Sequence, residues 1–292
     1  MKTSRRITSV ASLLIFTVIF TANSVSAISL LGINDDTDQL ELFDSDGSGG
    51  STILLEDVPD EIEDLVYAGN NTYYGIQSYN YGKNADKSSQ LYKFVMNGAL
   101  TSVSFEQVGN AFSATDIDSV EYIDGFLYTM DNKKDEFIKL DVDGTVTERT
   151  SVKGTGITKV EGMAYKDGML YVSDTKNDGQ RTTSTSRWDA DSSLFTIEIA
   201  SLSVDYIGQI GFGQVEALTF VGDSLYGTSD IHNTLFQVDL ATGTGSRVSD
   251  WGSDIEGIAG YAQPGVVPEP GTILLLGAGL IGLLAVHRKR VK

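Results

Sequence analysis

One short pattern recurs along the chain and restricts it to a small set of folds. In each copy an acidic residue opens an apolar, strand-like run, a tight turn follows, and a second run rich in Tyr and Leu comes after it. In the clearest copy, residues 160–174 (VEGMAYKDGMLYVSD), the turn is Asp167-Gly168, a strong hairpin signal. Further copies occupy residues 62–75, 117–131 and 215–230, and a truncated copy occupies residues 255–259. Repeats spaced by roughly 40 to 55 residues and built of short strands predict a β-propeller.

The ends of the repeat region predict how the propeller closes. Each complete copy continues into a third strand-like run, such as residues 137–141, and into a weaker fourth one, which makes a four-stranded blade. Residues 28–56 contain strands two to four of a blade without the first, whereas residues 254–261 supply a first strand alone. Together they would form one composite blade that leaves no sheet edge open. We therefore predict an all-β fold with five four-stranded blades, six being the alternative.

Side-chain size alternates along the first strand of each copy. Met163 and Tyr165 share one face of the predicted strand, and Gly162 and Ala164 share the other. Because the innermost strands of a propeller are covered on both faces, a large face packing against a small one is expected near the axis. Glu121 departs from this alternation, and the sequence offers no reason for it.

Composition excludes several classes of function. The 292 residues carry a formal net charge of −19 without a basic stripe in the body of the chain, which disfavours nucleic-acid binding. The absence of cysteine excludes disulfides, thiol catalysis and cysteine-type zinc sites. Only two histidines are present, so histidine-based catalysis in the body of the chain would rest on His232 alone.

The N-terminal residues 1–27 have the pattern of a secretory signal peptide. A basic start precedes an apolar run over residues 10–20, and Val25-Ser26-Ala27 forms a small-residue cleavage site. We expect cleavage between Ala27 and Ile28. The folded domain is then expected over residues 28–263.

The C-terminal residues 264–292 form a second targeting segment. Val267-Pro268-Glu269-Pro270 precedes an apolar run over residues 272–286, and a basic cluster over residues 287–290 follows. This arrangement resembles the PEP-CTERM sorting signal of exopolysaccharide-producing Gram-negative bacteria. The resemblance implies recognition and removal of the tail by the membrane protease-transpeptidase exosortase, after transient anchoring by an apolar, membrane-spanning helix. An ordinary C-terminal membrane anchor is the alternative. Removal of both ends would leave about 14 basic and 39 acidic residues, a domain charge near −25.

One position of the repeat is acidic in every copy and opens the first strand. Residues in equivalent positions should gather near one mouth of the central channel, where like charges repel unless a cation, raised pKa values or backbone amides offset them. One hypothesis is therefore a Ca²⁺-like site, and the alternative is that each acid caps loop amides of the next blade. These residues are Glu63, Asp118, Glu161, Glu216 and Glu256.

Two connections between second and third strands are long and polar, and both are expected at one rim, where propellers usually bind ligands. One contains Tyr79 and Tyr81, and the other contains Arg187 and Trp188. Trp188 is suited to stacking on a sugar ring, although packing against its own blade is the simpler expectation.

The opening Val160-Glu161-Gly162, followed by Asp167-Gly168, resembles the first strand in propeller lactonases and phytase-like esterases. That resemblance implies a metal-dependent hydrolase in which Glu161, Glu216 and Glu63 bind the metal and Asp118 or Glu256 is the base. A propeller glycosidase would need unlike acids in unlike places, whereas these positions are equivalent. We therefore expect no catalytic residues. We expect a secreted or cell-surface binding protein of the exopolysaccharide matrix, with hydrolase and purely structural protein as alternatives.

Overall fold

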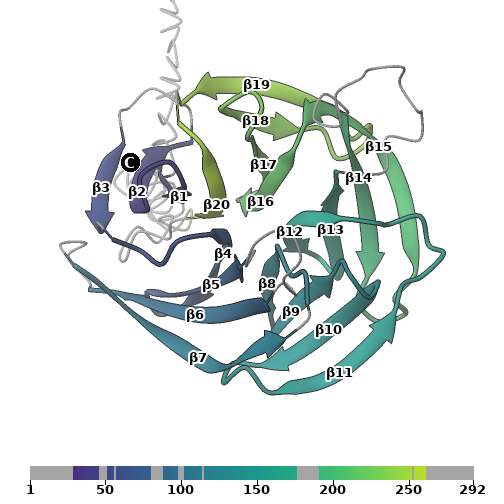
Figure 1. The fold of residues 1–292 in the computed structure, drawn as a ribbon. Helices are drawn as coiled ribbons and strands as arrows, with labels where there is room; N and C mark the ends of the chain where they lie inside the picture. The colour runs from purple at the N-terminus through teal and green to yellow at the C-terminus, as the bar shows by residue number, and fades with distance from the viewer. Residues whose placement is uncertain are drawn as a thin grey trace, which may run out of the picture.

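The computed structural model describes residues 29–45, 51–55, 57–79, 88–97, 102–113, 115–175, 191–251 and 253–260. These residues form five four-stranded antiparallel sheets arranged around a central axis, which confirms the five-bladed propeller (Figure 1). Among the described residues no helix is long and apolar enough to cross a membrane. The predicted signal peptide, its expected Ala27-Ile28 cleavage site and the sorting residues Val267 to Pro270 lie outside the described residues.

The innermost strands β20, β4, β8, β12 and β16 surround the axis, and the other strands follow outward in order (Figure 1). The composite blade contains β20 (Ile255–Gly260), β1 (Ser29–Asn34), β2 (Gln39–Asp44) and β3 (Thr52–Leu55). The second blade contains β4 (Ile62–Gly69), β5 (Thr72–Tyr79), β6 (Ser88–Met96) and β7 (Val103–Ser113). The third contains β8 (Val120–Ile123), β9 (Phe126–Asp131), β10 (Glu136–Asp141) and β11 (Val146–Ser151). The fourth contains β12 (Val160–Lys166), β13 (Met169–Asp174), β14 (Asp191–Glu198) and β15 (Val204–Gly213). The fifth contains β16 (Val215–Val221), β17 (Ser224–Ser229), β18 (Thr234–Val238) and β19 (Gly245–Asp250).

The ring closes through pairing of the first and last described strands, as the sequence predicts. β1 and β20 are antiparallel, with Leu30 opposite Gly260 and Asn34 opposite Ile255. The end of β1 is held further by a hydrogen bond of 3.1 Å from the Asp35 amide to the Asp254 carbonyl. Segments more than 200 residues apart thus share one sheet.

The strand directions define two rims. Each innermost strand begins at one rim, which also carries the connections from second to third strands; we call it the upper rim. The opposite rim carries the hairpin turns that follow the innermost strands, and we call it the lower rim. Two of these turns, Asp124-Gly125 and Asp167-Gly168, have positive φ at both residues, as the tight hairpin turns predicted from the sequence require.

The hydrophobic core is divided among the interfaces between blades. Residues of neighbouring blades share each cluster; Leu31 and Leu40 of the composite blade, for example, pack with Leu65 and Phe94 of the second. Two glycines allow the innermost strands to approach closely. A Cβ added at Gly162 would lie 2.8 Å from the backbone carbon of Ala217, and one added at Gly257 would lie 2.9 Å from that of Asp64. The predicted packing of small positions against the next blade is confirmed there.

Two other interfaces are bridged by buried carboxylates, which explains Glu121. Its carboxylate accepts hydrogen bonds from the amide of Tyr122 (2.7 Å) and from the amide of Tyr165 in the next blade (2.8 Å). Asp64 likewise accepts from the amides of Leu65 (2.8 Å) and of Val120 in the next blade (3.0 Å). Burial raises the pKa of Glu121 to about 8, although these hydrogen bonds favour the charged form. Both side chains are therefore structural acceptors between blades.

We expect Glu121→Gln to lower the free energy of unfolding by about 1–3 kcal/mol, because the amide NH₂ cannot accept from a backbone N–H and leaves it unsatisfied. Urea denaturation at pH 9, where Glu121 is ionised because its pKa is about 8, measures the change. Glu148→Gln, at an exposed position of β11 in the same blade, is the matched control. Equal stability of the two variants would contradict a bridging role for Glu121.

Candidate functional site

The repeated acids all lie at the upper rim, but they are not equivalent. Four of them are the second residues of β4, β12, β16 and β20, and Asp118 lies just before β8. Asp118 accepts a hydrogen bond of 3.1 Å from the side chain of Asn132. Asn132 also bonds the backbone of Val160 through both its side-chain amide atoms, so this group joins the third and fourth blades. Glu161 forms an ion pair with Lys159, which lies two residues before it.

The other three repeated acids, Glu63, Glu216 and Glu256, influence one another. The negative charges of Glu63 and Glu216 both raise the pKa of Glu256, and Glu63 also raises that of Glu216. The structure thus brings together the acids of the second, fifth and composite blades. Those of the third and fourth blades pair with residues nearby.

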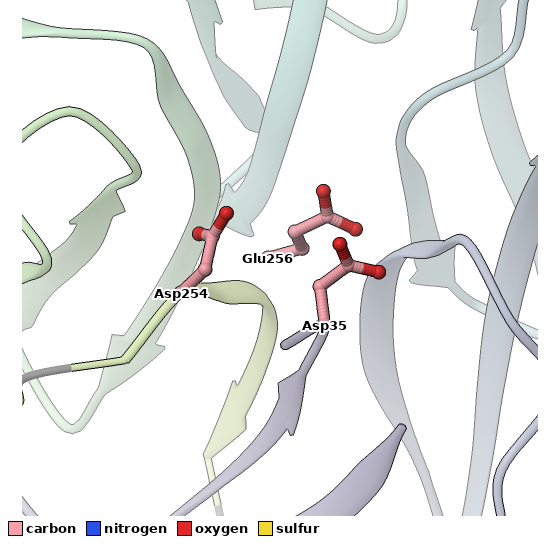
Figure 2. A group of neighbouring side chains, drawn as sticks. All are labelled: Asp35, Asp254 and Glu256. Atoms are coloured by element: carbon pink, nitrogen blue, oxygen red, sulfur yellow. The ribbon is translucent and has the colours of Figure 1, made fainter. Parts of the chain in front are cut away.

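Three further aspartates complete the cluster. Asp35 follows β1, Asp230 follows β17, and Asp254 precedes β20. Carboxylate oxygens of Asp35, Asp254 and Glu256 all lie within 4.8 Å of one another, as do those of Glu216, Asp230 and Asp254. Figure 2 shows the first group, whose side chains project to the same side from the paired strands β1 and β20 and the residues next to them. We call the six residues Asp35, Glu63, Glu216, Asp230, Asp254 and Glu256 the acidic cluster.

The sequence contains a repeated signal for two of these aspartates, Asp35 and Asp230, that the prediction did not use. An aspartate closes the second strand of four copies or follows it directly: Asp35, Asp131, Asp174 and Asp230. In the third and fourth blades it caps loop amides, as Asp174 does for Thr158. Asp35 and Asp230 instead face the acids of the first strands.

Burial and repulsion raise the pKa values of four members of the cluster: Asp35, Glu216, Asp254 and Glu256. Burial is the largest cause in each case, and neighbouring carboxylates add to it. The pKa of Asp35 is raised to about 6, that of Asp254 to about 7 and that of Glu256 to about 11. The pKa of Glu216 is raised well above its ordinary value, and the charge of Lys159 offsets this only in part.

Three oxygens of the acidic cluster are buried without a hydrogen-bond partner. They are Oε2 of Glu216, Oδ1 of Asp254 and Oε2 of Glu256. A buried oxygen without a hydrogen-bond partner raises the free energy of the folded state. A bound cation would lower it, because it coordinates these oxygens and reduces the repulsion between the carboxylates. Because all the donors are oxygens, the residues fit a hard cation such as Ca²⁺.

The predicted ligand loops cannot be placed at this site. Tyr79 ends β5, but its side chain, like all of Tyr81, Arg187 and Trp188, lies outside the description. The proposed sugar contact of Trp188 therefore stays a prediction.

Comparison with known proteins identifies two regions of the chain. A family model described as a repeat of unknown function (DUF6923) matches residues 76–263. A second, described as the PEP-CTERM protein-sorting motif, matches residues 266–289 and confirms the predicted sorting signal. A comparison with curated proteins finds no match.

Several solved structures are similar to this chain at low identity. A chain of the nidogen/laminin complex is 14% identical with a TM-score of 0.50, over 80% of this chain and 98% of that one. A putative 6-phosphogluconolactonase from Bacteroides fragilis is 11% identical with a TM-score of 0.43, over 81% of this chain and 98% of that one. The aldose sugar dehydrogenase from Streptomyces coelicolor is 14% identical with a TM-score of 0.44, over 79% and 81%. At these identities the likeness concerns the fold alone.

We expect the stability of the cation-free protein to fall as pH rises from about 4 to about 7. A carboxyl whose folded-state pKa is raised stabilises the protein below its unfolded pKa, and this contribution is lost as pH rises through the folded value. Asp35 and Asp254 define this window, and Glu256 continues the loss above it.

Glu256→Gln should make this decline of stability with pH shallower, by at most about 1.4 kcal/mol per pH unit for one proton. Melting temperatures between pH 4 and 9 in a chelator measure both effects, with Glu148→Gln as control. A decline as steep in Glu256→Gln as in the wild type would contradict the assignment.

Proposed function

We propose that this protein is a cell-surface binding protein that uses a divalent cation. The chain belongs to the family described as a repeat of unknown function (DUF6923), and it is a secreted, PEP-CTERM-sorted propeller. The acidic cluster binds the cation, Ca²⁺ above all, at the upper rim. The exosortase recognises the C-terminal motif and directs the protein to the surface.

The observation that carries this proposal is the buried, unpaired Oε2 of Glu216 within a cluster of convergent carboxylates. Burial raises the pKa of Glu216, and the nearby charges of Asp254, Asp230 and Glu63 raise it further. Asp64 and Glu121 each accept from two backbone amides, one of them in the next blade. Glu216 instead lies among carboxylates, with oxygens of Asp230 and Asp254 within 4.8 Å.

The donor set favours Ca²⁺ over softer metals. Zinc sites use Cys and His, but the chain has no cysteine, and the Nδ1 of His232 lies 3.0 Å from the hydroxyl of Ser229. Ca²⁺ takes six to eight oxygen ligands in variable geometry, which suits carboxylates from loops and strand ends.

The partner that suits such an ion is an anionic polysaccharide. A domain with an excess of acidic residues repels acidic sugars unless a cation lies between them. Ca²⁺ coordinated partly by the cluster can take its remaining ligands from sugar carboxylates. The proposed role in an exopolysaccharide matrix thus depends on the ion.

Binding is favoured over hydrolysis by the pairing of Glu161. The hydrolase alternative uses Glu161 as a metal ligand, and its carboxylate already pairs with Lys159. The same alternative offers Asp118 as a base, but Asp118 joins neighbouring blades through Asn132.

Calorimetric titration of the secreted chain with Ca²⁺ tests the proposal. We expect saturable binding and a higher melting temperature, because a ligand selective for the folded state stabilises it by about 2.7 kcal/mol at a hundredfold excess over Kd. Glu256→Gln should weaken binding roughly tenfold or more, equivalent to about 1.4 kcal/mol. Glu161→Gln should bind Ca²⁺ nearly as the wild type does.

Retention on immobilised alginate, an anionic polysaccharide, should require Ca²⁺ and should be lost with Glu256→Gln. No Ca²⁺ binding by the wild type would exclude the ion site and favour a purely structural protein. Ca²⁺ binding combined with Ca²⁺-independent retention would keep the ion and exclude its role in binding the polymer.

A further inference from the structure

Both ends of the propeller leave it at the lower rim. Ser29 begins β1 and Gly260 ends β20, and these ends are adjacent because Leu30 pairs with Gly260. The acidic cluster lies at the opposite ends of the same two strands, since Asp35 follows β1 and Asp254 precedes β20. The chain therefore continues toward its sorting motif from the face opposite the cluster.

The separation of the two rims is substantial. β20 has six residues, and a strand rises by about 3.3 Å per residue, so its ends lie about 17 Å apart.

The connection to the apolar segment restricts how the propeller can turn. Eleven residues separate Gly260 from the apolar run at residues 272–286, and in any conformation they span at most about 40 Å. The segment after Gly260 starts at the innermost strand of its blade. To reach the upper rim around the outside of the propeller it must first pass beneath the other three strands, a distance of about 14 Å for three strand spacings of about 4.8 Å. It must then rise about 17 Å along the blade. Presenting the acidic cluster to the membrane would use most of the available reach, whereas presenting the lower rim requires no detour.

From these constraints we infer that the lower rim faces the membrane while residues 272–286 are inserted in it, and that the acidic cluster points away. The occupant of this face is the bilayer surface entered by the chain's own C-terminal segment. The inference goes beyond the proposed function and does not require the cluster to bind a cation. If the cluster does bind one, the site is open to the matrix while the protein is still anchored, before the exosortase acts.

The absence of cysteine makes the orientation directly measurable. Ala241→Cys lies in the exposed turn between β18 and β19 at the lower rim, and Lys153→Cys lies in the exposed connection between β11 and β12 at the upper rim. Each variant is prepared without the predicted signal peptide, as residues 28–292, and labelled with one fluorophore. It is then reconstituted into phosphatidylcholine vesicles that contain a lipid-linked energy acceptor. We expect energy transfer to the lipid to be stronger from position 241 than from position 153, by a factor of about two or more, given the separation of about 17 Å.

The control is Leu280→Asp, which places a charge in the apolar run of each labelled chain. It should abolish energy transfer at both positions, because anchoring depends on that run. Equal transfer from both positions, or stronger transfer from position 153, would overturn the orientation. Failure of residues 28–292 to associate with vesicles, or undiminished transfer with Leu280→Asp, would also overturn it. None of these outcomes bears on Ca²⁺ binding in solution, so the two proposals fail separately.

Discussion

The structure depends on the pairing of β1 with β20. Without it the composite blade would lose its innermost strand, and two edges of unpaired backbone groups would be exposed on either side of the gap. The pairing joins segments more than 200 residues apart, so the loop-closure entropy is compensated only when the ring is complete. Hydrophobic clusters shared between neighbouring blades have the same consequence, because each blade presents half of an interface to the next.

Carboxylates serve two different purposes in this ring. Asp64 and Glu121 replace small residues at the packing positions of their strands, and each accepts two backbone hydrogen bonds, one of them from the next blade. Elsewhere the glycines Gly162 and Gly257 let the strands meet directly. A buried acid whose acceptors are all satisfied contributes to packing, whereas Glu216, Asp254 and Glu256 keep oxygens without partners. Asp118 and Glu161 also keep one oxygen without a partner, but they pair with Asn132 and Lys159. Convergence with other carboxylates, rather than burial or an unpaired oxygen alone, therefore marks the candidate ligands.

Much of the fold could be predicted from the sequence, because its signals are local and repeated. Turn dipeptides such as Asp167-Gly168 mark the hairpins, and the incomplete copies at the two ends predict the composite blade.

The candidate site was predicted less completely than the fold. Equivalent repeat positions suggested a symmetric ring of five acids, but the side chains beside each acid differ between blades. Lys159 pairs with Glu161 and Asn132 pairs with Asp118, whereas Asp35, Asp230 and Asp254 add negative charge near Glu216 and Glu256. Such differences arise from loops that do not follow the repeat, so only the folded structure reveals them.

The acidic cluster lies at the point where the ring closes, and this position links its electrostatics to the fold. Asp35 comes from the N-terminal part of the domain, and Asp254 and Glu256 come from the C-terminal part (Figure 2). Their repulsion therefore acts across the β1–β20 pairing, at the strand pair that completes the propeller. Any species that neutralises these carboxylates in the folded state alone, whether protons or a divalent cation, must stabilise the closed ring by its free energy of binding. At the lower rim Ser29 begins β1 and Gly260 ends β20, so closure also brings together the two points at which the chain enters and leaves the propeller, on the side away from the charge.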